Sequence, residues 1–408
     1  MSEFQLIGYL YGKEGTRVAD EETQLIQSLI RLLAGDGELE LEGVTFSAKE
    51  LTLSLSDLAG VPGLAEHIIP EPAQKGLIDV GYHIPARIYP GRIGEVILGS
   101  TRGDGGSRVR SVTIGGATSP PFHLFEGAGP HVPVVAGSVF DIVPPLPGPV
   151  RSSFGDALED PCAWAKAWVD RYGADLIDLD LIGTDPYLKD TPVKRAVGLV
   201  EDLLQAVDVP LIIGGSGNPE KDVKLLPKVA EVCAGERILL SSATTGMWEP
   251  VAKAAQEYNH VVLAWSPIDI NQAKELNRKL MGYLPPDQIV MDPTSAALGY
   301  GLEYSFSVME RIRLAGLMGD KELQCPQASG TANSWGAREA WKRDDSLGPR
   351  EFRGPLWETT GALAFLLAGV DLFIMVHPGA ARTIEDIVGW LADGRNPPTF
   401  PDFIGVGR

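Results

Sequence analysis

Short apolar runs alternate with longer amphipathic stretches along most of the chain. The apolar runs, each of a length suited to a buried strand, lie at 138–142, 176–182, 210–213, 238–241, 260–265, 289–291, 322–326 and 372–376. Stretches with helical periodicity stand between them, for example at 162–172, 193–207, 221–233, 270–281 and 304–317. Eight such repeats over about 260 residues predict an α/β fold, a (β/α)8 TIM barrel. A doubly wound open sheet is the alternative, because periodicity cannot show that a sheet closes.

The segments that precede these repeats have patterns of their own. Residues 95–100 and 108–114 alternate apolar and polar positions around a glycine-rich turn, which predicts a β-hairpin. Residues 1–60 hold eleven acidic and four basic residues and predict a small acidic α/β N-terminal module. The predicted domains are this module at 1–60, a linker and β-hairpin entrance at 61–133, the barrel at 134–395 and a C-terminal tail at 396–408.

The net charge narrows the possible partners. The 408 residues include 54 Asp and Glu against 35 Lys and Arg, a formal charge of −19. This balance argues against binding to nucleic acid or to an anionic membrane, because both need basic patches. No apolar run reaches the length of a bilayer span, and the first residues lack the pattern of a secretory signal. A cytoplasmic protein is therefore predicted.

The cysteines exclude some chemistry. Cys162, Cys233 and Cys325 are far apart and form no CxxC pair. This chain alone is therefore not expected to hold an iron–sulfur cluster or a structural zinc ion. Three scattered thiols also argue against a disulfide framework.

In a barrel of this kind the functional residues lie where the strands end. The residues that follow the predicted strands are mostly small, hydroxylated or amide-bearing, with few cations and few bases. Such a rim suits a neutral ligand rich in amides, contacted through many weak hydrogen bonds. It does not suit phosphate, which calls for Arg or Lys. No pattern shows a nucleophile with an adjacent base.

Several of these positions have two interpretations. The glycine-rich run at 214–218 is either a phosphate cradle or a plain strand-to-helix turn, and it lacks the complete phosphate-binding motifs. Asp178 and Asp180 point the same way, either into the barrel as a pair with raised pKa or out toward the helices. Asp292 could act in a site or cap its own turn. His377 could be a ligand or a satisfied structural residue.

Longer segments carry a specific resemblance. Residues 121–127 (PFHLFEG) and 299–316 (GYGLEYSFSVMERIRLAG) are the most informative, together with 112–116, 172–177 and 375–378. They closely resemble the small (delta) subunit of the corrinoid iron–sulfur protein of the CO dehydrogenase/acetyl-CoA synthase (acetyl-CoA decarbonylase/synthase) complex. The resemblance covers roughly residues 88–392. The acidic start is similar to the longer archaeal-type delta subunits, whereas 325–335 depart from the bacterial ones.

The resemblance implies a barrel related to pterin-dependent methyltransferases, whose carboxyl face holds a base-off corrinoid jointly with a large (gamma) subunit. The [4Fe–4S] cluster would lie on that subunit and not on this chain. The cobalt would take a methyl group from methyl-tetrahydropterin, through a methyltransferase, and deliver it to acetyl-CoA synthase in the reductive acetyl-CoA (Wood–Ljungdahl) pathway. The chain would be a methyl carrier of an anaerobic metabolism, inactive alone. It contains no DxHxxG motif, so it is not expected to supply a histidine ligand to cobalt.

Position at the strand ends selects the residues expected to border the corrinoid. They are Asp180, Thr184, Gly215, Ser216, Ser241, Thr244, Trp265, Asp292, Thr294, Gln327 and His377. Residues 121–127 and the hairpin are expected to contact the large subunit. Cys325 is either a thiol beside the cobalt or a buried, inert one.

Three other functions stay open. The first is a pterin-binding methyltransferase in its own right, with Asp180, Asn218 and Asp292 at strand ends. The second is an unrelated aldolase-type barrel, which the lack of a strand-end lysine disfavours. The third is a non-catalytic assembly subunit tethered by residues 1–60.

Overall fold

The computed structural model describes residues 84–127 and 129–393 of the chain. The chain divides into two units between Ile84 and Pro85, and every element below belongs to the second unit. The acidic module predicted at 1–60 and the tail predicted at 396–408 lie outside the described residues. The domain boundaries given for them therefore stay predictions.

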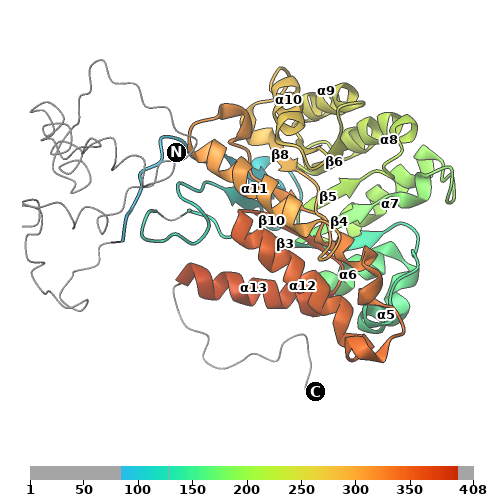
Figure 1. Ribbon diagram of the computed structural model, residues 1–408. Helices are drawn as coiled ribbons and strands as arrows, with labels where there is room; N and C mark the ends of the chain where they lie inside the picture. The colour runs from blue at the N-terminus through green and yellow to red at the C-terminus, as the bar shows by residue number, and fades with distance from the viewer. Residues whose placement is uncertain (1–83, 128, 394–408) are drawn as a thin grey trace, which may run out of the picture. The chain divides into compact units, whose positions relative to one another are not determined.

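Eight parallel strands form the centre of the fold (Figure 1). They are β3 (Val134–Phe140), β4 (Leu176–Asp180), β5 (Leu211–Gly214), β6 (Leu239–Ala243), β7 (Val261–Trp265), β8 (Ile289–Asp292), β9 (Ala328–Ser329) and β10 (Leu372–Met375). Their order is β8-β7-β6-β5-β4-β3-β10-β9. A parallel bridge between Met291 and Gln327 joins the two edge strands, and the Met291 amide donates to the Pro326 carbonyl at 2.8 Å. The sheet closes, so the predicted barrel is confirmed.

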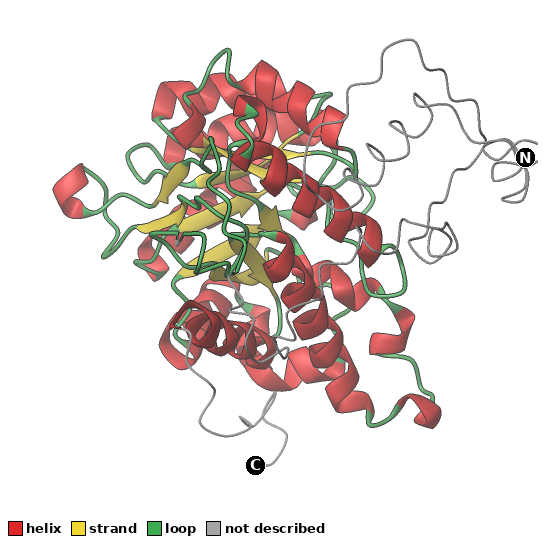
Figure 2. Ribbon diagram, turned by 60° about the vertical axis from the view of Figure 1, so that its left-hand side comes forward, coloured by secondary structure: helices red, strands yellow, loops and turns green. Residues whose placement is uncertain are grey.

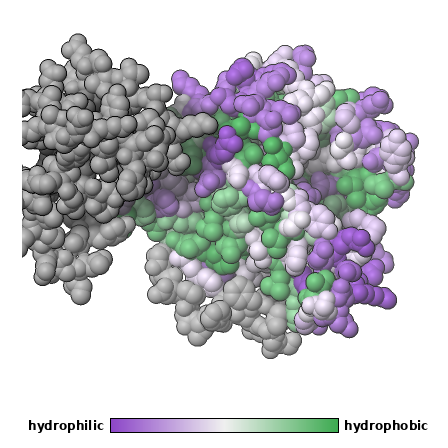
Figure 3. Space-filling model, viewed as in Figure 1, coloured by the Kyte–Doolittle hydropathy of each residue, from purple (hydrophilic) through white to green (hydrophobic). Residues whose placement is uncertain are grey.

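Helices surround the strands on the outside, as Figure 2 shows by colour. They are α5 (Gly148–Phe154), α6 (Pro161–Tyr172), α7 (Val193–Ala206), α8 (Pro219–Val232), α9 (Trp248–Tyr258), α10 (Ile270–Leu280), α11 (Leu302–Leu317), α12 (Arg350–Ala368) and α13 (Pro378–Asp393). Hydrophilic residues cover α9 and α10, whereas more hydrophobic surface surrounds α11 and α12 (Figure 3). In the described part of the chain, no helix is long and apolar enough to cross a membrane.

The seventh barrel strand is not where the sequence predicts it. The run 322–326 was predicted as a strand, but Lys321–Leu323 forms a 3-10 turn capped by Asp320, whose Oδ1 accepts the Glu322 amide at 3.3 Å. The alternation of buried Leu323 and Cys325 misled the prediction, because both side chains enter the core from a turn. The actual strand, β9, has two residues and begins only at Ala328.

A β-hairpin closes the amino end of the barrel. Its strands, β1 (Glu95–Leu98) and β2 (Val112–Gly115), pair antiparallel, which confirms the predicted hairpin. Val96, Leu98 and Ile114 are fully buried against the first inward-facing side chains of the barrel strands. The hairpin therefore lies at the opposite end from the strand ends where function is expected.

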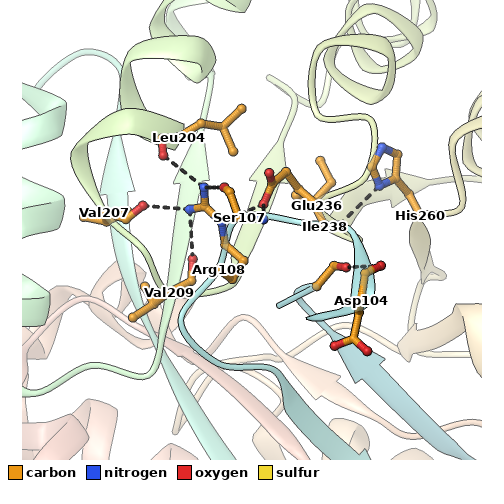
Figure 4. A network of polar contacts seen from close by, with 10 residues as sticks. Asp104, Ser107, Arg108, Leu204, Val207, Val209, Glu236, Ile238 and His260 are labelled. Carbon is orange, nitrogen blue, oxygen red and sulfur yellow. Dashed lines mark hydrogen bonds and ion pairs between the residues drawn. The ribbon is translucent and has the colours of Figure 1, made fainter. Parts of the chain in front are cut away.

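The turn of the hairpin is anchored by one buried arginine (Figure 4). Arg108 is 3% exposed, and its Nη1 and Nη2 donate to the carbonyls of Val207 and Leu204 at 2.7 and 3.0 Å, at the end of α7. Its Nε donates to Glu236 Oε2 at 2.7 Å. A cation at a helix carboxyl end is favoured by the helix dipole as well as by these bonds.

Replacing Arg108 with methionine removes the charge and keeps most of the side-chain volume. Because Glu236 and two helix carbonyls lose a buried donor, we expect the free energy of unfolding to fall by about 3 kcal/mol in urea denaturation of the full chain. The control is Arg110→Met, whose ion pair with Asp175 is half exposed, at 48% and 52%, and whose loss should cost less than about 1 kcal/mol. Equal losses in the two variants would contradict the anchoring role.

Candidate functional site

The inside of the barrel is apolar at its amino end and polar at its carboxyl end. Side chains two residues apart on a strand share a face. The inward-facing Leu176 of β4 is therefore followed by Asp178 and Asp180, and Ala136 of β3 by Ser138. In the same way, the inward apolar residues of β5, β6, β7 and β8 are followed by Gly214, Ser241, Trp265 and Asp292. The polar layer lies at the end where ligands bind in this fold.

Two adjacent carboxyl groups form the floor of this polar layer. Asp178 is 1% exposed, and its Oδ2 accepts from Ser138 Oγ at 3.5 Å, while its Oδ1 has no partner. A Cβ on Gly214 would lie 2.1 Å from Asp180 Oδ1, so the glycine makes room for that carboxyl. The pair points into the barrel, which decides between the two orientations that the sequence left open.

Burial favours the protonated forms of this pair. Desolvation, and then the charge of Asp141, raises the pKa of Asp180 to about 7. Desolvation, and then the charge of Asp180, raises the pKa of Asp178 well above its usual value. Two carboxyl groups this close cannot both ionise at low cost. The floor of the site therefore carries less negative charge than two ordinary carboxylates would, and it can donate as well as accept hydrogen bonds.

Asp292 ends β8 on the other side of the polar layer. Burial raises its pKa to about 6, although its Oδ1 accepts the Thr294 amide at 2.8 Å. Thr294 has a positive φ of 72° and donates through Oγ1 to the Ser266 carbonyl at 2.6 Å. Asp292 thus caps its own turn, as one of its two interpretations proposed, and also faces the mouth of the barrel.

The glycine-rich run after β5 is a structural turn. The carboxylate of Asp222 accepts the amides of Ser216 and Gly217 at 3.0 and 2.8 Å. A Cβ on Gly215 would lie 2.5 Å from this carboxylate. Because Asp222 already occupies the amides that would face a phosphate, the phosphate-cradle interpretation is wrong. Asn218 is occupied as well, since its Oδ1 caps α8 by accepting the amides of Glu220 and Lys221.

Ten of the eleven candidate residues lie at the carboxyl ends of the strands. Those over β4 to β8 are Asp180, Thr184, Gly215, Ser216, Ser241, Thr244, Trp265, Asp292 and Thr294, and His377 follows β10. Trp265 is the most exposed of the candidate residues, at 38%. Thr184 is fully buried and donates its hydroxyl to the Leu181 carbonyl, so it supports the rim from below.

The placement expected for Gln327 is wrong. Because β9 begins at Ala328, Gln327 lies at the amino end of the barrel, where its amide donates to Asp371 Oδ2 at 2.9 Å. Its side-chain Nε2 donates to the Met309 carbonyl at 3.0 Å. Cys325 lies at the same end, 1% exposed, and burial raises the pKa of its thiol to about 12. This is the inert thiol of the two interpretations.

His377 serves the local structure. Its Nδ1 accepts the Ala380 amide at 3.2 Å in the first turn of α13, and its ring lies 6.1 Å from that of Trp335. Burial lowers its pKa to about 4, so the ring is neutral. Across residues 84–127 and 129–393, no group of three or more His, Cys, Asp or Glu side chains is arranged to hold a metal ion.

Sequence reasoning missed Glu358 of α12. This fully buried carboxylate accepts the Val376 amide at 2.7 Å, the His377 amide at 3.1 Å and Trp335 Nε1 at 2.9 Å. Burial raises its pKa to about 7, against the effect of these three donors. It ties the end of β10 to the loop after β9. The available signal was one acidic residue in an apolar helical stretch.

The family to which the chain belongs follows from its sequence over the described barrel. The profile of the family described as CO dehydrogenase/acetyl-CoA synthase delta subunit matches residues 95–344. The chain is a member of this family. The sequence resemblance is thereby confirmed at the level of the complex and its subunit.

Several members of this delta-subunit family match this chain over most of its length. The acetyl-CoA decarbonylase/synthase complex subunit delta of Methanocaldococcus jannaschii is 44% identical over 380 residues, 90% of this chain and 92% of that protein. The subunit of Methanopyrus kandleri is 46% identical over 366 residues, 88% and 91% of the two chains. That of Archaeoglobus fulgidus is 53% identical over 312 residues, 74% and 69%.

The similar solved structures are more distant. A Xanthomonas albilineans dihydropteroate synthase with 4-aminobenzoic acid is 18% identical with a TM-score of 0.45, over 65% of this chain and 94% of that one. A Yersinia pestis dihydropteroate synthase is 17% identical with a TM-score of 0.43, over 63% and 93%. The barrel fold of this chain is therefore established by its own strand order and not by these similarities.

The buried carboxyl pair predicts a pH dependence of stability. Between about pH 4 and pH 7 the folded chain keeps a proton at Asp180 that the unfolded chain has released, so the free energy of unfolding falls as pH rises. In Asp180→Asn this fall should be shallower by up to about 1.4 kcal/mol per pH unit in urea denaturation. Asp202→Asn, at an exposed position of α7, should leave the slope unchanged. An unchanged slope in Asp180→Asn would show that this carboxyl holds no proton.

Glu358 can be tested by exchanging one oxygen for an amide. In Glu358→Gln at least one of the three N–H donors faces another donor, so we expect the free energy of unfolding to fall by about 3 kcal/mol. Glu351→Gln, in the exposed first turn of α12, is the matched control and should change it by less than about 0.5 kcal/mol. A Glu358→Gln chain as stable as the wild type would rule out a tie between β10 and the β9 loop.

Proposed function

We propose that this delta-subunit family member covers a base-off corrinoid with the carboxyl face of its barrel, jointly with a large (gamma) subunit that carries the [4Fe–4S] cluster. The observation that carries the proposal is the neutral rim over β4 to β8. None of the eight strands is followed within three positions by Lys or Arg. A corrin ring has an edge of neutral amide side chains, and such a ring fits a rim of hydroxyl and backbone groups.

The donors and acceptors of the rim suit such a ligand. Ser216, Ser241 and Thr244 are half-buried at the mouth and offer hydroxyl groups. The buried Ser266 Oγ and Asp178 Oδ1 have no hydrogen-bond partner within the described chain. Buried polar atoms are rarely left unpaired. These atoms are available for amide groups, or for water held between the protein and a ring.

The residues at the mouth would orient and shield the bound group. Trp265 would pack its half-exposed indole against the ring, and the raised pKa values of Asp178 and Asp180 would reduce the negative charge under it. A bound corrinoid supplies a cobalt that accepts and gives a methyl group. The protein contributes position and the exclusion of water. The described residues of this chain provide no base and nucleophile pair, so we expect it to be inactive alone.

The partners proposed for this chain follow from that function. The family belongs to a complex, so other subunits are present. Besides the large subunit, we propose a methyl-tetrahydropterin methyltransferase as the source of the methyl group and acetyl-CoA synthase as its acceptor. The carboxyl face must then be covered in one state and open in others.

A pterin-binding methyltransferase is the second candidate function. The buried carboxyl groups of Asp180 and Asp292, whose pKa values burial raises to about 7 and about 6, favour it, because carboxyl groups can pair with ring amide groups. Asn218, the third residue considered for this role, is already used to cap α8. A titration of the full chain with methyl-tetrahydropterin separates the two, because only the second function requires a tight site on this chain alone.

The absorbance spectrum of the chain purified alone and with its large subunit tests the corrinoid proposal directly. We expect base-off corrinoid bands in the two-subunit complex and no methyl transfer by the chain alone. In Trp265→Ala the complex should hold its corrinoid about tenfold more weakly, because an aromatic contact with the ring is lost. Leu367→Ala, at an exposed apolar position of α12, is the control. A wild-type complex without corrinoid bands would overturn the proposal.

A further inference from the structure

A pocket lies on the other half of the carboxyl face. It has a volume of about 500 Å³ and lies over the ends of β3, β9 and β10, away from the rim over β4 to β8. Its principal lining residues are Phe140, Leu146, Arg151, Trp335, Trp341 and Arg350. We refer to it as the Arg–Trp pocket. None of the residues invoked for the corrinoid lines it.

The charged groups of the Arg–Trp pocket are all positive. Arg151 and Arg350 line it, and no Asp or Glu does. Neither arginine forms an ion pair with any described carboxylate, although the chain has a net charge of −19. Two unpaired guanidinium groups in one pocket of an acidic protein point to an anionic partner.

The wall that carries Trp341 is fixed before any partner arrives. Arg350 Nε donates to the Trp341 carbonyl at 2.8 Å. The buried Arg353 donates to the carbonyls of Glu339 and Lys342 at 3.3 and 2.7 Å, on either side of the tryptophan. The backbone is therefore held, while the indole of Trp341 is 43% exposed. An open indole on a fixed backbone is typical of a binding anchor.

The facing wall is fixed as well. Trp335 is held through Nε1 by Glu358, and a Cβ on Gly354 of α12 would lie 2.0 Å from the Trp335 ring. The indole thus packs closely against α12 at a position without a side chain. Two tryptophans with fixed backbones make the pocket preorganised, which lowers the entropy cost of binding.

The geometry points to an acidic peptide as the occupant: we propose that the Arg–Trp pocket binds an acidic segment of the large subunit. Carboxylates of that segment would pair with Arg151 and Arg350, and one apolar side chain would lie between Trp335 and Trp341. A peptide is favoured over a small anion because exposed apolar surface continues past the pocket. Val143 is 47% exposed beside it and Leu347 is 38% exposed. The choice of partner rests on the proposed function.

The test uses the full chain and the large subunit in isothermal titration calorimetry at about 50 and about 300 mM salt. The double variant Arg151→Gln/Arg350→Gln should bind about 30-fold more weakly at low salt and should lose most of the salt dependence of the wild type. Trp341→Ala should bind about tenfold more weakly and keep that salt dependence. Arg311→Gln, at an exposed position of α11, is the control and should match the wild type.

Two results would overturn the proposal, and a third measurement separates it from the proposed function. Wild-type affinity and salt dependence in the double variant would overturn the proposal. So would saturable binding of ADP that needs both arginines while binding of the large subunit does not, since the pocket would then be a small-anion site. The corrinoid absorbance of the same complexes keeps the proposals apart. If the complex contains no corrinoid but its affinity still falls in the double arginine variant, the Arg–Trp pocket is supported and the proposed function is overturned.

Discussion

A closed barrel must fill its own interior, and this requirement decides what its open end offers to a ligand. Each strand contributes every second residue to the inside, so the interior is a stack of layers. In this chain the lower layers are leucine, isoleucine, valine and alanine, sealed by Val96, Leu98 and Ile114 of the hairpin. The upper layer contains Asp178, Asp180 and Asp292, and burial raises the pKa of each of these carboxyl groups.

Buried carboxylates hold the loops around this mouth, and they divide it into two halves. Asp222 gathers the amides of the turn after β5, and Glu358 gathers those at the end of β10 together with the Trp335 indole. Neither forms an ion pair with a described cation, so both rely on N–H donors in place of water. Hydroxyl and buried carboxyl groups line the half of the mouth over β4 to β8, whereas aromatic and cationic side chains line the Arg–Trp pocket.

The repeating strands and helices of this architecture could be predicted from the sequence, whereas the irregular elements mostly could not. The barrel and the hairpin could be predicted because strand and helix periods differ and because β1 and β2 alternate so regularly. The position of β9 could not, because a two-residue strand has no period and the buried Leu323 and Cys325 mimic one. As a result Gln327 was placed at the wrong end of the barrel.

The candidate site was likewise predictable in part. Ten of its eleven residues were found by reading strand ends, yet the pattern could not distinguish Trp265, which is open, from Thr184, which is fully buried. The inward direction of Asp178 and Asp180 needed the strand register. Glu358 was missed because its three partners come from segments about 20 residues away, a distance over which local patterns carry no information.

The hairpin also has a consequence for how the chain reaches its native state. Its residues leave the ribosome before any barrel strand, but the surface on which they pack includes Leu372 of the last strand. Pairing of β3 with β10 joins Val134 to the same Leu372, across nearly the whole barrel sequence. Contacts of such long range form slowly. The amino end of the barrel can therefore be sealed completely only after synthesis is almost complete, because the last part of the apolar surface under the hairpin is made that late.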